Sequence, residues 1–387
     1  MTARIYYNDS FIQEFKADII DYFEVEGKYH LKLNKTAFYP EGGGQPADHG
    51  TIGDSNISHV YEKNGEIFHI ADRLPPEKSG LSCKLNWERR FDLMQQHSGQ
   101  HLLSAVAEDL YQAVTVGFHL GESGLTIDTD IQLSQAEIEK IETKCNQLIY
   151  ENRNITVEYP GGDKDDTRII KIAGLDRNPC GGTHLTSTGQ IGIISIIDSD
   201  NYKGGSRLHF ACGERGVKDY RFKNKLTAFF RDRLSVNDQN ITAEITRLLA
   251  ELDTKSKTID NLKSRLLDFK KAELLKSAEE IENYCFIVNS FTGFGFSEVK
   301  ELASQLVMDN GIIAIFGQLD GDTTRMILAR SADITELNMN SVIQEVMPIL
   351  EGNGGGRPDF VQGGGSNPEK LPEAISLARE IIINRLK

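Results

Sequence analysis

The chain has 387 residues, of which 39% are hydrophobic and 26% charged, with a formal net charge of -14 at pH 7. This length supports two or three domains with buried cores, and the negative charge argues against nonspecific binding to nucleic acid outside a local basic patch. The five widely spaced cysteines do not suit a disulfide framework, and no apolar run of about 18 residues or secretory signal is present, so we expect a cytoplasmic protein without a membrane anchor.

Short alternating stretches separated by Gly, Asn and Pro turns, such as KYHLKLNKTAFY, predict a β-rich subdomain over residues 1–90. An apolar pattern near 3.6-residue spacing then predicts a helix over 91–111. A strand pair around GFHLGESGLTIDTD, a second helix over 134–152 and two strand candidates in GQIGIISIIDSDNYKGGSRLHFACG follow. Together they predict an α+β domain over 91–235, in which helices pack on an antiparallel sheet.

Residues 236–283 contain no Gly and no Pro, and their apolar residues are mostly three or four positions apart, which is typical of a helical seam. Because Lys255 and Glu273 interrupt this seam, a helical connector or hairpin is favoured over a long dimeric coiled coil. Alternating strand and helix patterns over 284–387 predict a small α/β domain. Its stretch GNGGGRPDFVQGGG indicates either a flexible loop or backbone that a phosphate or ribose can approach closely.

Four side chains have the types and spacing of a metal site. His97 and His101 stand four residues apart on the predicted helix, so both imidazoles project from one face. Such a pair alone is weak evidence, but Cys180 and His184 lie in NPCGGTH, where Pro and Gly form a turn that brings a thiolate and an imidazole together. Three nitrogens and one sulfur match the preference of tetrahedral zinc, so we predict a Zn²⁺ site.

The spacing of these ligands narrows the class of site. Because 78 residues separate the two pairs, a small zinc finger is excluded, and a catalytic or substrate-binding site is favoured. A thermolysin-like protease is disfavoured, since Ser98 stands where an HExxH motif needs a glutamate base. A thiol nucleophile formed by Cys180 and His184 stays open as an alternative.

Two further segments each have two interpretations. The motif TAFYPEGGGQPADHG is either a Gly-rich turn between strands or exposed backbone flanked by Glu41, Gln45 and Asp48 that a ligand can approach. From Lys203 to Arg233, nine Lys or Arg residues against three acidic residues give a local charge of +6. This basic segment is either a solvated helix face or a contact for RNA phosphates.

The motifs FYPEGGGQPADHG, HSGQH and NPCGGTH closely resemble those of the editing domain of alanyl-tRNA synthetase and of the AlaX proteins, over about residues 1–235. The rest of the chain resembles the tail of the same synthetase, with a DHHA1-type domain marked by GGRPDFVQGGG. The resemblance to the long AlaX type implies an α+β protein with a β-rich N-terminal part, a zinc-binding editing domain, a helical connector and a small α/β DHHA1-type domain.

The resemblance also implies an activity without an aminoacylation core. The expected reaction is hydrolysis of the ester that joins serine, or alternatively glycine, to alanine tRNA, and the bound Zn²⁺ would either orient the substrate or polarise a water. Thr115 and Gln45 are the implied catalytic-site residues, with Thr115 as a hydrogen-bonding partner for the serine hydroxyl. The implied tRNA contacts are in the basic segment and the Gly-rich stretch: Lys203, Arg207, Arg215, Arg221, Gly354, Gly355, Gly356 and Arg357. A homodimer through the connector or the DHHA1-type domain is a further family property.

Other functions compete with this one. The chain would be a catalytically inert tRNA-binding protein if its metal site were not used, or a zinc-dependent hydrolase of another ester. A phosphoesterase is disfavoured. Phosphoesterases that contain a DHHA1 domain also need an Asp-His-His metal motif, and the chain has only Asp48-His49-Gly50.

Overall fold

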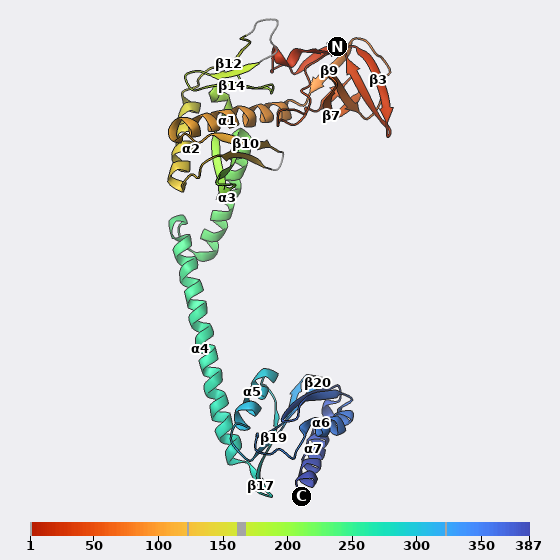
Figure 1. Cartoon of the computed structure of the whole chain (residues 1–387), viewed down its shortest axis with the longest axis vertical. Helices are drawn as coiled ribbons and strands as arrows, with labels where there is room; N and C mark the ends of the chain where they lie inside the picture. Colours follow the sequence, from red (N-terminus) through yellow and green to blue (C-terminus); the bar gives the residue numbers. More distant parts are fainter. Residues whose placement is uncertain (1, 122–123, 161–167, 322) are drawn as a thin grey trace. The chain divides into compact units, whose positions relative to one another are not determined.

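The structure is a computed structural model that describes residues 2–121, 124–160, 168–321 and 323–387. The chain divides into two compact units, Met1–Asp238 and Gln239–Lys387. Each combines helices with sheets in which almost all neighbouring strands are antiparallel (Figure 1). The predicted α+β fold is therefore confirmed. Among the described residues, no helix has both the length and the apolar character that a membrane span requires.

The N-terminal part of the first unit is an antiparallel sheet of seven strands in the order β2-β9-β6-β7-β8-β4-β3. Its strands are β2 (Glu14–Ala17), β3 (Ile19–Val25), β4 (Lys28–Leu33), β6 (Gly50–Ile52), β7 (Ser55–Lys63), β8 (Glu66–Ala71) and β9 (Leu81–Leu85). Strand alternation buries Leu31 and Leu33 on one face, as a period of two requires. Two short parallel strands, β1 (Ala3–Arg4) and β5 (Lys35–Thr36), precede the Gly-rich motif.

Helix α1 (Trp87–Tyr111) is buried along most of its length. It begins four residues before the predicted start, because the side chain of Asn86 accepts a hydrogen bond from the backbone N–H of Arg89 and caps the first turn. It ends at Tyr111, and the next residue, Gln112, has a left-handed backbone conformation. Apolar residues of α1 pack with helix α2 (Gln135–Tyr150) in the largest core of this unit. The helix is thus part of the core along most of its length.

Two smaller sheets complete the first unit around α1. One has four strands in the order β10-β11-β16-β15, and the other has three in the order β12-β13-β14. Their strands are β10 (Thr115–Leu120), β11 (Leu125–Thr129), β12 (Ile155–Glu158), β13 (Ile169–Ile172), β14 (Asp176–Pro179), β15 (Ile194–Tyr202) and β16 (Gly205–Cys212). Helix α3 (Gly213–Leu234) follows. The predicted strand pair is confirmed as β10 and β11, and the two strand candidates are confirmed as β15 and β16, which also pair with each other.

The second unit has a six-stranded sheet in the order β17-β18-β19-β20-β22-β21, in which only β18 and β19 are parallel. The strands are β17 (Glu279–Ile281), β18 (Tyr284–Phe291), β19 (Ile312–Asp320), β20 (Thr323–Arg330), β21 (Asn353–Arg357) and β22 (Phe360–Gly365). The helices are α4 (Ile241–Lys276), α5 (Phe296–Leu306), α6 (Met339–Val346) and α7 (Leu371–Leu386).

Two segments of this unit settle open alternatives. The connector is one continuous helix, α4, of 36 residues, because Lys255 and Glu273 are good helix formers whose charges reach solvent; the hairpin alternative is wrong. The Gly-rich stretch is not a flexible loop, since β21 and β22 form a hairpin at the edge of the sheet. Glycine is needed there because a Cβ at Gly354 would lie 2.8 Å from the side chain of Ile343.

Candidate metal centre

The four predicted metal ligands converge in the first unit. His97 and His101 lie one turn apart on α1, and Cys180 and His184 lie on the loop that follows β14. Their candidate donor atoms are all within 4.8 Å of one another, and the three histidines are buried. Sγ of Cys180 is 3.4 Å from Nε2 of His97 and 3.2 Å from Nε2 of His184. The arrangement can hold a metal ion.

Each of the three imidazoles has an oxygen beside its second ring nitrogen. Nδ1 of His97 donates to Oε1 of Gln45 at 3.0 Å. Nδ1 of His101 is 3.5 Å from Oδ2 of Asp176, and Nδ1 of His184 is 3.4 Å from Oγ of Ser98. These acceptors favour the tautomer in which Nε2 carries no proton and is free to bind a metal, which is how metal-ligating histidines are usually oriented.

The sequence singled out none of the three acceptors as a partner of a metal ligand, and Gln45 was implied only as a catalytic-site residue. Ser98 stands directly after His97, and its Oγ also accepts the backbone N–H of Leu185 at 3.1 Å. Asp176 precedes the NPCGGTH motif, and no residue pattern marked it. Ser98 follows a ligand directly in sequence, but the sequence alone does not separate it from any other helical serine.

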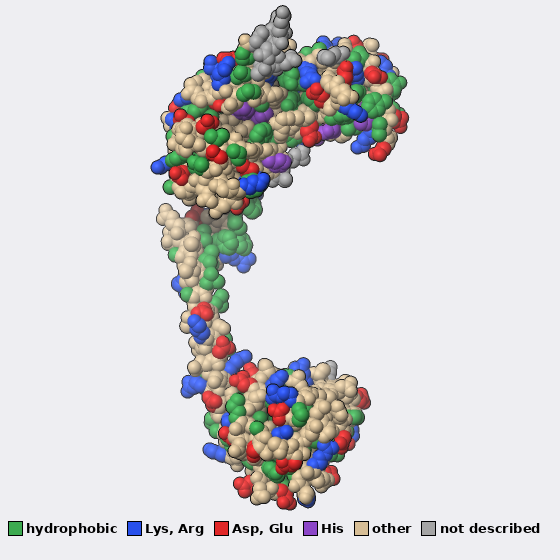
Figure 2. All heavy atoms as spheres, viewed as in Figure 1, with side chains coloured by type: hydrophobic (Ala, Val, Ile, Leu, Met, Phe, Trp, Pro, Cys, Tyr) green, Lys and Arg blue, Asp and Glu red, His purple; other side chains and the backbone are tan. Residues whose placement is uncertain are grey.

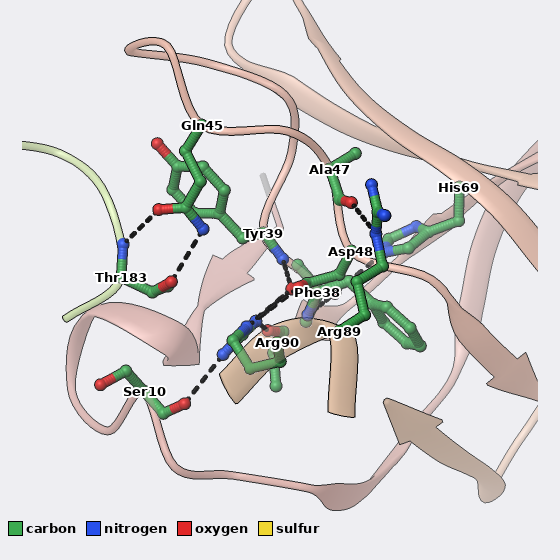
Figure 3. Close-up of polar contacts among 12 residues, drawn as sticks. Ser10, Phe38, Tyr39, Gln45, Ala47, Asp48, His69, Arg89, Arg90 and Thr183 are labelled. Atoms are coloured by element: carbon green, nitrogen blue, oxygen red, sulfur yellow. Dashed lines mark hydrogen bonds and ion pairs between the residues drawn. The ribbon is translucent and has the colours of Figure 1, made fainter. Parts of the chain in front are cut away.

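Gln45 joins the two halves of the centre, and Figure 3 shows its two hydrogen bonds with Thr183. Its Oε1 accepts not only from His97 but also from the backbone N–H of Thr183 at 3.0 Å, and its Nε2 donates to Oγ1 of Thr183 at 2.8 Å. The side chain is only 1% exposed. The geometry therefore places Gln45 beside a ligand as its hydrogen-bond partner.

The Gly-rich motif that carries Gln45 is fixed to α1 by a buried ion pair (Figure 3). Nε of Arg90 donates to both carboxylate oxygens of Asp48 at 3.0 Å, and its Nη1 donates to the carbonyl oxygen of Ser10 at 2.9 Å. Asp48 also accepts the backbone N–H of Tyr39 at 2.6 Å. Both charged side chains are almost fully buried, so loss of either partner would leave an uncompensated charge, at a cost of about 3–5 kcal/mol.

The loop that carries Cys180 and His184 is shaped by a glycine and an arginine. A Cβ on Gly182 would collide with the ring of His97 and lie 2.8 Å from Oε1 of Gln45. Nη1 of Arg168 donates to the carbonyl oxygens of Cys180 and Gly182 at 2.9 and 2.7 Å. The close approach of this loop to α1 therefore depends on the absence of a side chain at Gly182.

The titrating groups of the centre are strongly coupled. Burial raises the pKa of the Cys180 thiol, but the three imidazoles beside its Sγ outweigh this effect and lower the pKa to about 2. Burial lowers the pKa of His97 and of His184 below the usual range. For His101, burial is outweighed by the hydrogen bonds to Asp176 and Cys180, and the pKa rises to about 9. These directions favour a deprotonated Cys180 and neutral His97 and His184, which are the forms that bind a metal, and a bound metal would displace any proton held by His101.

Thr115 lies on β10 and forms a hydrogen bond with the hydroxyl of Ser104 on α1. Its Oγ1 donates to Oγ of Ser104 at 2.7 Å, and Ser104 also accepts from Nε2 of Gln100 at 3.0 Å. Ser104 stands seven residues after His97 and therefore on the same face of the helix. Thr115 is thus connected to the helix face that carries two of the ligands.

The four tRNA contacts predicted in the basic segment include two arginines in ion pairs and two exposed cations. Arg207 forms a two-pronged ion pair with Asp128 at 2.6 and 2.8 Å, and its guanidinium lies 3.7 Å from the ring centroid of Tyr202. Arg215 is similarly paired with Asp92. Lys203 and Arg221 are exposed. The four tRNA contacts predicted in the Gly-rich stretch, Gly354, Gly355, Gly356 and Arg357, lie on β21 in the second unit.

Comparisons with known proteins match both units. The family described as "DHHA1 domain" matches residues 283–384, and "Threonyl and Alanyl tRNA synthetase second additional domain" matches residues 167–209. "Alanyl-tRNA editing protein AlaX-L" of Pyrococcus horikoshii is 29% identical, over 97% of this chain and 96% of that protein. "Alanine–tRNA ligase" of Methanoregula boonei is 30% identical over 100% of this chain, which spans only 44% of the ligase. The solved "C-Ala domain from Aquifex aeolicus alanyl-tRNA synthetase" is 31% identical over 27% of this chain and 97% of that chain, with a TM-score of 0.26.

Proposed function

We propose that this chain, which resembles alanyl-tRNA editing proteins of the long AlaX type over nearly its whole length, hydrolyses the aminoacyl ester of mischarged alanine tRNA at a zinc centre. The observation that carries the proposal is the convergence of His97, His101, Cys180 and His184 on one point. The substrate we propose is alanine tRNA that carries serine, with glycine as the second choice.

The donor set fits Zn²⁺. Three imidazole nitrogens and one thiolate are ligands that Zn²⁺ prefers, and four is its usual number of ligands. With three of these side chains bound and one position open, Zn²⁺ would supply a Lewis acid for a carbonyl or a water, and with all four bound it would supply a template that orients the ester. Gln45, Asp176 and Ser98 would hold the imidazole rings in their orientations, and outer partners of this kind raise metal affinity.

A thiol nucleophile explains less of the centre. The 3.2 Å separation of Cys180 Sγ and His184 Nε2 suits a thiol and its base. A nucleophile of this kind needs one imidazole, however, whereas three converge here, and each has its own acceptor. The surplus of oriented imidazoles favours a metal site.

Selection against correctly charged tRNA requires a group that serine satisfies and alanine leaves unpaired. We propose Thr115 for this role, because its hydroxyl donates to Ser104 and still has lone pairs to accept the hydroxyl of a seryl group. For the tRNA backbone we propose Lys203 and Arg221, which are exposed. Arg207 and Arg215 would contribute less, because a phosphate must compete with their carboxylate partners. The residues of β21 would form a separate tRNA contact.

We also propose a homodimer, through α4 rather than through the DHHA1-type domain, although Lys255 and Glu273 led us to expect no long dimeric coiled coil from the sequence. The helix has a seam with steps of three and four residues, which is the spacing of a coiled coil: Ile245, Leu248, Leu252, Lys255, Ile259, Leu262, Leu266, Phe269 and Glu273. The apolar members from Leu252 onward are 52–71% exposed, and Figure 2 shows hydrophobic side chains on the surface of this helix. A second copy of the helix would cover them.

The two charges in the seam determine the direction of the pair. In a parallel pair, Lys255 would face Lys255 of the other copy, and Glu273 would face Glu273. In an antiparallel pair centred near residue 264, Lys255 of one copy faces Glu273 of the other. The next layers are then apolar, with Ile259 against Phe269 and Leu262 against Leu266. We therefore propose the antiparallel arrangement, since charges placed in the core of a coiled coil specify its register.

Deacylation of purified aminoacyl-tRNA tests the proposed activity. The zinc-loaded chain should release serine from alanine tRNA and leave alanine in place, and a Cys180→Ala, His184→Ala variant should lose both zinc and activity. Cys285→Ala, which changes a cysteine in the second unit, is the matched control. Zinc-loaded wild-type protein that leaves both serine and glycine esters intact would instead support a catalytically inert tRNA-binding protein. Equal hydrolysis of simple esters would support a hydrolase of another class.

A further inference from the structure

Phe118 is an exposed aromatic side chain at the edge of the candidate metal centre. It lies on β10 and pairs across the strands with Ile127, which is fully buried, so both side chains belong to the core-facing side of the sheet. Phe118 nevertheless keeps 42% of its surface exposed. Its ring centroid is 6.4 Å from that of His97, with an angle of 30° between the planes.

The Gly-rich motif leaves space for this ring. A Cβ on Gly44 would collide with the ring edge of Phe118 and lie 3.0 Å from its Cζ. Gly44 also has a φ of +79°, a left-handed conformation that favours glycine. Gln45, the next residue, contacts His97. The ring is therefore held between two segments that build the metal centre, and its remaining surface is available to a ligand.

We propose that Phe118 stacks on the terminal adenine base of the tRNA while the aminoacyl ester lies at the metal centre; this inference rests on the proposed function. The scissile ester and the adenine are attached to the same terminal ribose. A group that binds the base must therefore be separated from the metal ligands by about the width of a ribose. The 6.4 Å between the ring centroids of Phe118 and His97 fits this requirement. Unpaired bases bind proteins mainly by stacking on aromatic side chains, and stacking accepts any amino acid on the ester.

Fluorescence of a modified substrate tests this contact directly. The probe is alanine tRNA whose terminal adenine is replaced by 2-aminopurine and whose serine is joined by a non-hydrolysable amide. Because stacking quenches 2-aminopurine, zinc-loaded wild-type protein should quench it, and Phe118→Ala should not. In parallel, Phe118→Ala should raise the KM for deacylation about ten-fold with kcat little changed, the size expected for one lost stacking contact.

Two control variants make the outcomes interpretable. Phe118→Tyr should restore quenching, and Val116→Ala, on the same strand and 68% exposed, should behave as the wild type. Quenching that persists in Phe118→Ala would overturn the stacking contact while wild-type deacylation left the proposed function intact. Loss of zinc or of thermal stability in Phe118→Ala would assign the ring a structural role and also overturn it. Wild-type protein that neither quenches nor deacylates would overturn both proposals.

Discussion

Gln45 and His97 are 52 residues apart in sequence, yet Oε1 of Gln45 lies 3.0 Å from Nδ1 of His97. The same oxygen accepts the backbone N–H of Thr183, which lies on the loop that carries Cys180 and His184. Gln45→Ala should therefore remove a hydrogen bond from the imidazole of His97 and another from this loop. We expect zinc affinity to fall about 10–100-fold, as for other losses of a partner of a metal-ligating histidine. Competition with a chromophoric chelator measures this, with Glu41→Ala in the same motif as the control. Unchanged affinity would show that Gln45 does not orient the ligand.

Substitution by alanine should have different effects at the two neighbouring glycines of the loop that carries Cys180 and His184. A Cβ at Gly182 collides with the ring of His97, whereas a Cβ at Gly181 meets only the hydroxyl of Tyr7, at 3.7 Å. Gly182→Ala should therefore lose most bound zinc and most deacylation, and Gly181→Ala should keep both. Elemental analysis of the two purified variants makes the comparison. Equal zinc content in the two would contradict the close packing of this loop against α1.

His69 should make the stability of the first unit depend on pH. Burial lowers its pKa to about 4, and Nδ1 donates to the carbonyl of Leu31 while Nε2 accepts from the hydroxyl of Thr36. In the unfolded chain the imidazole has its usual pKa of about 6.5. As pH falls from about 6.5 to about 4, only the unfolded state takes up this proton, so this contribution to stability is lost at about 1.4 kcal/mol per pH unit.

Urea unfolding of the wild type and of His69→Gln at several pH values isolates this term. Glutamine has a donor and an acceptor but does not titrate in this range. The variant should be less stable than the wild type near pH 7, and the difference should shrink toward pH 4. A difference that stays constant with pH would mean that His69 is not the group responsible.

Charge exchange in α4 should report the register of the proposed dimer. Lys255→Glu would place two glutamates face to face in each charged layer, and Glu273→Lys would place two lysines there. Each single change should weaken dimerisation at least about ten-fold, equivalent to 1.4 kcal/mol, and the double variant should recover it because the pair is only reversed. Sedimentation equilibrium measures the dissociation constants. A double variant as weak as the single ones would rule out the antiparallel register.

Sequence patterns predicted the parts of this protein that depend on local periodicity. The helix with His97 and His101 follows from apolar spacing, and its four-residue step puts both imidazoles on one face. The role of Gln45 could not be predicted, because it arises only when the Gly-rich motif closes on α1. Asp176 and Ser98 are ordinary residues until tertiary contacts place them beside imidazoles.

The Gly-rich hairpin shows the opposite limitation. Glycine is a poor strand former, so a stretch with seven glycines in fourteen residues indicates a loop. In the structure, α6 and the following residues pack so closely on β21 and β22 that side chains would collide at Gly354 and Gly363. Tertiary packing therefore overrides local preference. The proposed boundaries of the four segments, at 90, 235 and 283, stay predictions.

The division of the four candidate ligands between α1 and the loop after β14 would make metal binding depend on folding. An unfolded chain offers two separate pairs of ligands, and each pair alone would bind Zn²⁺ more weakly than the four together. Under the proposed zinc centre, a weak chelator should therefore remove the metal from unfolded molecules before it removes the metal from folded ones.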